Sequence, residues 1–397
     1  MVDFSRSVSE MRSSEIRDLM SSATDPNMIS FAGGMPNNDL FPVDEVNELY
    51  NNLPQKLKQV GFQYGPTTGF PPLVDTLREY LRGMNLPVDT NEIMITAGSM
   101  QAISIAARVY LDPGDIVITE MPCFIGAIAA FKAQLADIRT VPMDEDGLII
   151  DELDKVFRAA ERKPKMIYLS PYFHNPAGIV YSKERKAELL HYLKDKDIIM
   201  LEDDPYSELY FDDDVKKLMV PMKCTQPEPV PIMYTGTFSK ILGPGMRLGW
   251  LLCRKDIFQK CDVTKQSIDA CSSTFTQVIA DAYVKNGMLK SYVARMREVY
   301  KRRMEITVAA LEKYMPEGVT WVKPRGGFYV WLTLPEYIDA TEVLKKSIPN
   351  GALFVVGKTF DPAGKINNNI RLSYSYPAEE NLEKGVKIIA DALKATL

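Results

Sequence analysis

Residues 231–254 read PIMYTGTFSKILGPGMRLGWLLCR, and this stretch places a cluster of polar groups between two apolar runs. The runs at 231–235 and 247–253 have the length and composition of buried strands. The segment between them carries hydroxyl, amine and guanidinium groups, on Thr237, Ser239, Lys240 and Arg247. Its glycines do not form G-x-G-x-x-G, and Lys240 precedes them, which excludes a Walker A loop. The stretch predicts a strand that ends in a polar loop.

The same alternation of short apolar runs with helix-period segments extends over residues 92–254. Four more runs are predicted as strands, at 92–96, 115–120, 165–170 and 197–201. Between them, residues 100–111 and 181–193 have helical periodicity, and Ser182 is in position to cap the second helix. This order predicts an α/β fold with a mostly parallel sheet covered by helices.

Polar residues follow the predicted strands, where ligands bind in open α/β sheets. Ser99 begins a helix whose N-terminus favours an anion, Asn175 follows the third strand, and Asp203 and Tyr206 follow the fourth. Considered one at a time, each residue has an ordinary structural explanation: Ser99 as a helix cap, Asn175 as a turn residue and Lys240 as a surface lysine. Together, a lysine amine, an anion site with an arginine and a strand-end carboxylate suit pyridoxal phosphate (PLP), which carries an aldehyde, a phosphate and a basic ring nitrogen.

Composition limits the other possibilities. The chain has 397 residues, with 47 Lys and Arg against 52 Asp and Glu, a net charge of −5 that argues against nucleic acid or an anionic membrane as the main partner. The two histidines, His174 and His191, exclude a His-rich metal site, and we expect no metal. Five cysteines without a C-x-x-C, and a polar N-terminus, predict a cytoplasmic protein with reduced thiols and no membrane segment.

The last third of the sequence changes character. Residues 286–314 have helical spacing, 321–334 are strand-like, and a terminal helix follows Pro377. We therefore predict a large α/β domain at 45–288 and a smaller, discontinuous α+β domain formed by 1–44 and 289–397.

Three motifs give the sequence a specific resemblance. Thr237-x-Ser239-Lys240-x₆-Arg247, Asn175-Pro176-Ala177-Gly178 and Asp203-x-x-Tyr206, in this spacing, resemble fold-type I PLP-dependent aminotransferases of class I/II, over almost the whole chain. MISFAGGMPN at 28–37, QYGPTTG at 63–69 and NIRLSY at 369–374 are similar to the 2-aminoadipate/kynurenine aminotransferase subgroup. The resemblance implies a seven-stranded, mostly parallel sheet in the large domain and a homodimer with active sites at the subunit interface.

The resemblance also implies roles for individual residues around the cofactor ring. Lys240 would bind PLP as a Schiff base and afterwards move the substrate proton. Asp203 would pair with the pyridine N–H; Asp204 suits this role less, because the tyrosine lies three residues after Asp203. Asn175 and Tyr206 would hydrogen-bond the 3-oxygen of the ring.

The remaining roles concern the phosphate and the substrate. The phosphate would lie at the helix start, bound by Ser99, Met100, Thr237, Ser239 and Arg247, with Tyr64 reaching it from the neighbouring subunit. Arg371 would bind the substrate carboxylate, and Gly34 and Asn175 would contact the substrate. Arg17 aligns with a substrate-side arginine, although it also reads as an exposed helix arginine.

Two positions depart from the pattern of the family. Phe124 would stack on the cofactor ring where a tyrosine is usual, so the hydroxyl is absent. Met100 stands where the subgroup often has glutamine, which limits its phosphate contact to the backbone N–H. Both departures weaken a transfer of substrate preference.

Three functions fit the sequence. The first is a transaminase that exchanges an amino group between an L-amino acid (2-aminoadipate, an aromatic or a broad range) and a 2-oxo acid such as 2-oxoglutarate. The second keeps the cofactor but is a carbon–sulfur β-lyase. The third is a PLP-binding regulatory domain of a transcription factor. It is disfavoured because about 30 residues precede Phe31, without a basic recognition helix.

Overall fold

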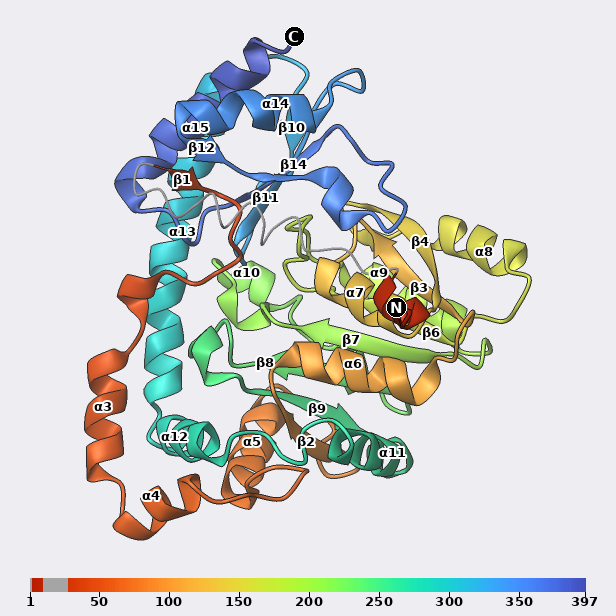
Figure 1. The fold of residues 1–397 in the computed structure, drawn as a ribbon, viewed down its shortest axis with the longest axis vertical. Coiled ribbons are helices and arrows are strands. Elements are labelled where there is room, and N and C mark those ends of the chain that lie inside the picture. The colour runs from red at the N-terminus through yellow and green to blue at the C-terminus, as the bar shows by residue number, and fades with distance from the viewer. Residues whose placement is uncertain (1, 10–27) are drawn as a thin grey trace.

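A mixed sheet of eight strands forms the centre of the computed structural model, which describes residues 2–9 and 28–397 (Figure 1). The strand order is β2-β9-β8-β7-β6-β3-β4-β5. The bounds are β2 Glu92–Thr96, β3 Ile116–Met121, β4 Asp137–Asp144, β5 Gly147–Leu148, β6 Met166–Leu169, β7 Ile199–Asp204, β8 Ile232–Thr237 and β9 Gly249–Cys253. The six strands predicted from apolar runs are all present, with ends shifted by up to three residues.

The expected count of seven strands is corrected to eight. The additional strand is β5, which has two residues and pairs antiparallel with β4 at the edge of the sheet. Apolar runs did not reveal β4 either, because its sequence, DIRTVPMD, is half polar and only one of its eight residues, Val141, is buried. β4 lies next to the edge, and β5 pairs only with its residues Met143 and Asp144, so its side chains stay in contact with water and lack the apolar signal of a central strand.

Strand direction places the functional loops together. The pairs β3·β4, β3·β6, β6·β7 and β7·β8 are parallel, whereas β9 is antiparallel to both β8 and β2. Because β9 lies between β2 and β8 and is antiparallel to each of them, β2 and β8 run in the same direction. The carboxyl ends of β2, β6, β7 and β8 therefore meet at one edge of the sheet.

Helices cover both faces, and the alternation of side chains along each strand decides which helix each residue meets. Met94, Tyr168 and Leu201 pack against the helices α6 (Ser99–Tyr110), α7 (Ile125–Ala133) and α11 (Lys255–Gln266). Ile167 and Met200 point to the opposite face, where α8 (Ile150–Ala159) and α9 (Lys183–Leu193) lie. On that side of β2, Ile93 and Ile95 join a core that includes α5 (Pro71–Gly83) and α12 (Thr274–Lys285).

A second layer of structure lies above the large sheet in Figure 1. Its sheet has the order β10-β11-β14-β13, all antiparallel, with β10 Thr320–Trp321, β11 Tyr329–Thr333, β14 Asn369–Ser373 and β13 Val355–Val356. The helices here are α13 (Met288–Tyr314), α14 (Ala340–Ser347) and α15 (Glu379–Lys394). β1 (Ile29–Ser30) pairs in parallel with β12 (Ala352–Leu353), which joins an N-terminal segment to the C-terminal third. The exact division into two domains stays a prediction.

Two helix starts test the cap assignments. The hydroxyl of Ser182 accepts a hydrogen bond from the backbone N–H of Arg185, which confirms the predicted cap of α9. For α6 the cap residue is Gly98, with a φ of 84°, and Ser99 is the first residue inside the helix. The reading of Ser99 as a cap is therefore wrong; the left-handed φ at this position favours glycine.

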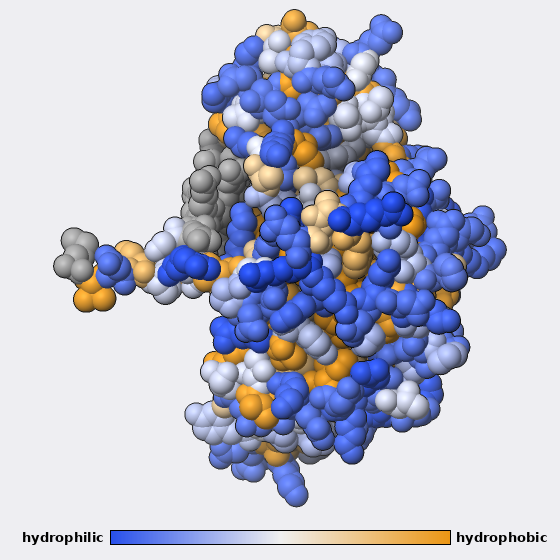
Figure 2. Space-filling model, turned by 90° about the vertical axis from the view of Figure 1, so that its right-hand side faces the viewer, coloured by the Kyte–Doolittle hydropathy of each residue, from blue (hydrophilic) through white to orange (hydrophobic). Residues whose placement is uncertain are grey.

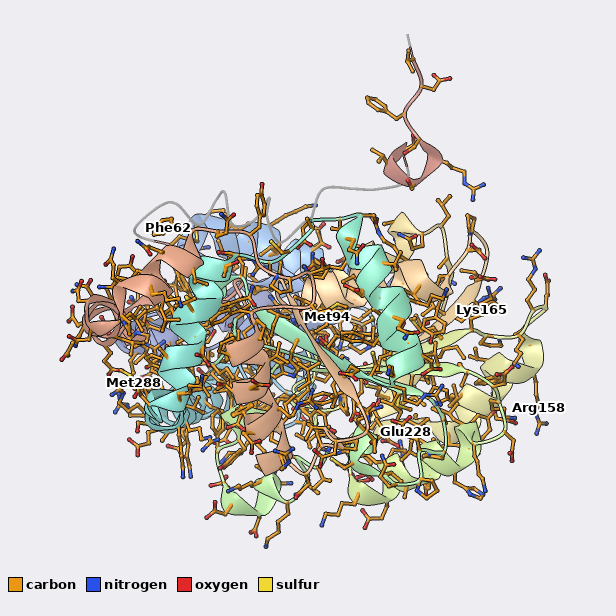
Figure 3. All side chains as sticks on the ribbon, turned by 90° about the horizontal axis from the view of Figure 1, so that it is seen from below. Phe62, Met94, Arg158, Lys165, Glu228 and Met288 are labelled. Carbon is orange, nitrogen blue, oxygen red and sulfur yellow. The ribbon has the colours of Figure 1, made fainter. Side chains whose placement is uncertain are left out.

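The remaining helices are α1 (Arg6–Ser9), α3 (Val43–Asn52), α4 (Gln55–Gly61) and α10 (Asp213–Lys216). The segment that contains α1 projects away from the body of the molecule (Figures 2 and 3). Within residues 2–9 and 28–397, no helix combines the length and the apolar character needed to cross a membrane.

Candidate active site

A cavity of about 280 Å³ opens at the carboxyl edge of the large sheet, below the second layer. Its walls come from the ends of four strands, from the start of α6, and from residues 34, 329 and 371 of the second layer and its N-terminal connection. Most of the predicted site residues line it: Gly34, Ser99, Met100, Phe124, Asn175, Asp203, Tyr206, Thr237, Ser239, Lys240, Arg247 and Arg371. Residues separated by more than 300 positions in sequence thus face one space.

Lys240 extends into this cavity from the loop that follows β8. Its Nζ donates a 2.6 Å hydrogen bond to the carbonyl oxygen of Gly34 and lies 5.9 Å from the ring centre of Tyr206. Burial, together with the positive charges of Arg371 and Arg247, lowers the pKa of the amine to about 8. A sizeable fraction of Lys240 is therefore neutral and nucleophilic slightly above neutral pH.

Asp203 and Asp204, adjacent at the end of β7, have different surroundings. Oδ2 of Asp203 accepts a 2.8 Å hydrogen bond from Tyr168, while its buried Oδ1 has no partner among the described residues. Both oxygens of Asp204 are used, by the hydroxyl of Tyr234 and the N–H of Ser207. Asp203 lines the cavity and Asp204 does not, so only Asp203 has a free acceptor there.

The pKa of Asp203 reflects this environment. Burial raises the pKa to about 7, with a smaller contribution from the charges of Asp204 and Glu120 and against the hydrogen bond from Tyr168, which lowers it. A buried carboxyl with a free oxygen and a raised pKa needs a cationic N–H partner to stay ionised.

The end of the cavity nearest the strand ends is built to bind an anion. The first N–H groups of α6, at Ser99 and Met100, have no partner within the helix, and the helix dipole adds positive potential. Arg247 approaches so closely that a Cβ on Gly98 would lie 3.1 Å from its Nη2. The hydroxyl of Thr237 donates to that of Ser239 at 2.9 Å, on the same side. Amides, hydroxyls and a guanidinium together suit a phosphate.

The opposite end is formed by Arg371, a guanidinium that is only 2% exposed. Nη1 donates to Oδ1 of Asn175 at 2.9 Å, Nη2 donates to the carbonyl oxygen of Ala32, and Nε has no partner in the described part of the chain. Burial lowers the pKa of this group. A buried cation held only by neutral groups is an incomplete ion pair, and a carboxylate would complete it.

Sequence reasoning missed Tyr329, the first residue of β11, which lines the cavity between these two ends. Its hydroxyl lies 2.9 Å from that of Tyr206, and the guanidinium of Arg371 lies 4.6 Å from the centre of its ring. The Gly326-Gly327 pair ahead of the strand was the available signal, because Gly327 has a φ of 68° that re-aims the chain into the site.

Five residues singled out from the sequence differ in their placement. Phe124 lines the cavity as the cap residue of α7. Tyr64 is 86% exposed and does not line it. Arg17 lies outside the described residues. His174 is fully buried and contacts Glu120, with 3.2 Å between Nε2 and Oε2, while His191 is exposed on α9.

The donor set fits PLP. Lys240 supplies the amine, the unpartnered Oδ1 of Asp203 suits a pyridinium N–H, and the start of α6 with Arg247 suits the phosphate. Arg371 is left for a carboxylate of the substrate.

Comparison with known proteins agrees with this geometry. A family model described as aminotransferase class I and II matches residues 26–389. The aromatic-amino-acid aminotransferase 1 of Thermococcus litoralis is 38% identical, over 98% of this chain and 94% of that protein. The 2-aminoadipate transaminase of Thermus thermophilus is 32% identical, over 99% and 97%. The crystal structure of Pyrococcus horikoshii kynurenine aminotransferase, in complex with PMP, has a TM-score of 0.94 and 36% identity, and covers 99% of this chain and 97% of that one.

Proposed function

Because this chain belongs to the class I and II aminotransferase family and is a PLP-dependent transaminase, we propose that it moves the amino group of an aromatic L-amino acid or of 2-aminoadipate to 2-oxoglutarate. The main support for this proposal is that one cavity combines the amine of Lys240, the free oxygen of Asp203 and the incompletely paired Arg371. The names of the two relatives supply the substrate classes, and Arg371 supplies a site for the carboxylate that all these substrates share.

The residues around the ring would act as follows. When bound, PLP supplies an electron-poor ring that spreads the negative charge left at Cα after proton removal. Asp203, ionised, accepts the hydrogen bond of the ring N–H. Oδ1 of Asn175 is occupied by Arg371, which leaves its Nδ2 to donate to the 3-oxygen together with the hydroxyl of Tyr206.

Lys240 would carry the proton. Its amine, with a pKa of about 8, would bind the cofactor, and after displacement by substrate its Nζ would take up the proton of Cα and pass it on. Ser99, Met100, Thr237, Ser239 and Arg247 fix the phosphate. Arg371 orients the substrate by a two-pronged contact with its carboxylate, beside Gly34 and Phe124.

Substitution of Lys240 tests this assignment. Lys240→Ala should lose covalent attachment of PLP after borohydride reduction, shown by peptide mass spectrometry, and should lose turnover by at least about 10³-fold. Lys186→Met is the matched control, because Lys186 is also buried and has a pKa lowered to about 8 by burial, but lies outside the cavity. Borohydride labelling that persists in Lys240→Ala would refute the assignment.

A donor panel tests the substrate class. Phenylalanine, tyrosine, kynurenine, 2-aminoadipate and alanine, each with 2-oxoglutarate, should give the highest kcat/KM for an aromatic donor or 2-aminoadipate. The β-lyase alternative predicts steady pyruvate release from L-cystathionine without an oxo acid, and the relatives, named as transaminases, do not favour it. They do not favour a regulatory domain either.

We also propose a cytoplasmic homodimer in which Tyr64 completes the phosphate site of the partner. Tyr64 and Phe62 are 86% and 79% exposed, unusual for large aromatic side chains. Phe62 lies on the side of the molecule from which residues 2–9 project (Figure 3). Mixing Tyr64→Ala with Lys240→Ala subunits should restore activity, because each hybrid then holds one site with both residues. No recovery in verified hybrids would refute a shared site.

A further inference from the structure

The hydroxyls of Tyr206 and Tyr329 share a buried hydrogen bond at the wall of the cavity. Their hydroxyl oxygens lie 2.9 Å apart, and the side chains are only 2% and 1% exposed. Burial raises the pKa of Tyr206 well above its ordinary value, so its hydroxyl stays protonated at neutral pH. Two neutral hydroxyls that share one hydrogen bond place one hydrogen between them and leave the other to point elsewhere.

Tyr206 can donate to the cofactor only if the hydrogen between the two oxygens comes from Tyr329. Its hydroxyl is pressed against Gly34, where an added Cβ would be 2.1 Å from the phenolic oxygen. No acceptor other than Tyr206 is bonded to it among the described residues. If Tyr206 donated to Tyr329, its one hydrogen would be used there, and only its lone pairs would face the cavity. If Tyr329 donates, the hydrogen of Tyr206 is free to enter the cavity.

The position of Tyr329 is rigid. Its backbone packs on Gly178, where a Cβ would lie 2.8 Å from the carbonyl oxygen of Tyr329, and it pairs with Ser373 in the second-layer sheet. Its ring lies against the guanidinium of Arg371. The hydroxyl of Tyr329 is therefore held in place independently of Tyr206.

We propose that Tyr329 is a positioning residue that donates its hydroxyl hydrogen to Tyr206 and thereby makes Tyr206 a donor to the 3-oxygen of the cofactor. This inference rests on the proposed role of Tyr206. A phenol that accepts a hydrogen bond is a stronger donor, because the bond polarises its own O–H. Tyr329 thus stabilises negative charge on the cofactor oxygen without contacting it.

The test is a pH titration of the visible absorbance of the PLP-loaded enzyme without substrate. The nitrogen that links Lys240 to the cofactor shares its proton with the 3-oxygen, so a weaker donor at that oxygen raises the midpoint of the titration. Tyr329→Phe keeps the ring and its packing, and should raise the midpoint by about half to one pH unit. Tyr206→Phe should raise it further.

A double variant separates positioning from a general effect. In the Tyr206→Phe background, Tyr329→Phe should produce no further shift, because its recipient has gone. Tyr374→Phe is the matched control: it removes another buried hydroxyl, bonded to the carbonyl oxygens of Gly326 and Gly327, and should leave the midpoint unchanged. Saturating PLP and a thermal unfolding curve confirm that each variant is loaded and folded.

The outcomes are distinct. A midpoint in Tyr329→Phe equal to that of the wild type, or an equal shift in both backgrounds, overturns the proposal. A Tyr206→Phe variant that does not shift the midpoint contradicts the proposed role of Tyr206 itself. Absence of the titration from loaded wild-type enzyme contradicts the assignment of the cofactor to Lys240.

Discussion

The phenol of Tyr168 donates a 2.8 Å hydrogen bond to Oδ2 of Asp203, while Oδ1 of the same carboxyl is buried without a partner among the described residues. One oxygen is thus fixed by the protein and the other is reserved for a ligand. The hydrogen bond holds the plane of the carboxyl, and burial keeps its pKa near 7. Cofactor-free protein therefore carries an electrostatic cost that a cationic ring nitrogen would relieve.

The first prediction concerns the pH dependence of the cofactor-free protein. Between about pH 4 and 7 the unfolded chain ionises this carboxyl and the folded chain does not, so the contribution of Asp203 to the free energy of unfolding falls as the pH rises. Asp203→Asn removes this loss. Between pH 4 and pH 8 its free energy of unfolding, measured by urea unfolding, should therefore rise by up to about 4 kcal/mol relative to that of wild type.

Asp204→Asn provides the control for that experiment. Asp204 accepts hydrogen bonds from Tyr234 and Ser207, and its loss should destabilise the protein rather than stabilise it. With PLP present, Asp203→Asn should bind the cofactor more weakly than wild type. A stability difference between Asp203→Asn and wild type that stays constant from pH 4 to 8 would contradict the raised pKa.

The second prediction concerns the close contact between Gly34 and Tyr329. Gly34→Ala would place a Cβ 2.1 Å from the hydroxyl oxygen of Tyr329 and should cost about 1–3 kcal/mol of unfolding free energy. In a Tyr329→Phe background the nearest atom is Cζ at 3.2 Å, so the same substitution should cost clearly less. Chemical denaturation of the four proteins measures the coupling.

Gly83→Ala is the control for that cycle, since nothing lies within 4 Å of the added Cβ, and it should be close to neutral. Equal costs for Gly34→Ala in both backgrounds would show that the hydroxyl of Tyr329 is not the obstacle.

The third prediction concerns the carboxylate site. Arg371→Lys keeps a positive charge but cannot make a two-pronged contact, and should lower kcat/KM for amino-acid donors by about 10²–10³-fold. PLP absorbance should be retained, because Arg371 is not one of the residues assigned to the phosphate or to the covalent attachment. Arg303→Lys, at another buried arginine that donates to the carbonyl oxygen of Ser375 and lies outside the cavity, is the matched control. Equal losses in the two variants would mean a general packing effect.

The fourth prediction concerns the buried histidine. His174→Gln should lower the free energy of unfolding by about 1–3 kcal/mol, because it disturbs the contact with Glu120 and the acceptor that Nδ1 offers to the N–H of Ala177. Turnover should stay within about tenfold of wild type, since Lys240 carries the proton. His191→Gln, on an exposed helix surface, should change neither. Loss of turnover in a stable, PLP-loaded His174→Gln would give His174 a direct role.

Much of the site could be predicted from sequence because its residues follow strands. The apolar runs around Lys240, Asp203 and Asn175 mark central strands, and parallel strands bring their carboxyl ends to one edge. Strand β4 escaped prediction because its mostly unburied residues lack that apolar signal, and β5 because it has only two residues. Tyr329 escaped because its strand belongs to the second layer, far from the lysine in sequence.

The sequence by itself determined the chemistry of this protein: the spacing of Lys240, Arg247, Asp203 and Asn175 identifies the cofactor and the family. Only the tertiary structure decided the state of these groups. Burial, which no local pattern encodes, lowers the pKa of Lys240 and raises that of Asp203, and Tyr168 determines which oxygen of Asp203 stays free. The contact between Tyr329 and Tyr206 joins residues 123 positions apart, and the hydroxyl of Tyr329 lies against Gly34, which comes from the other end of the chain.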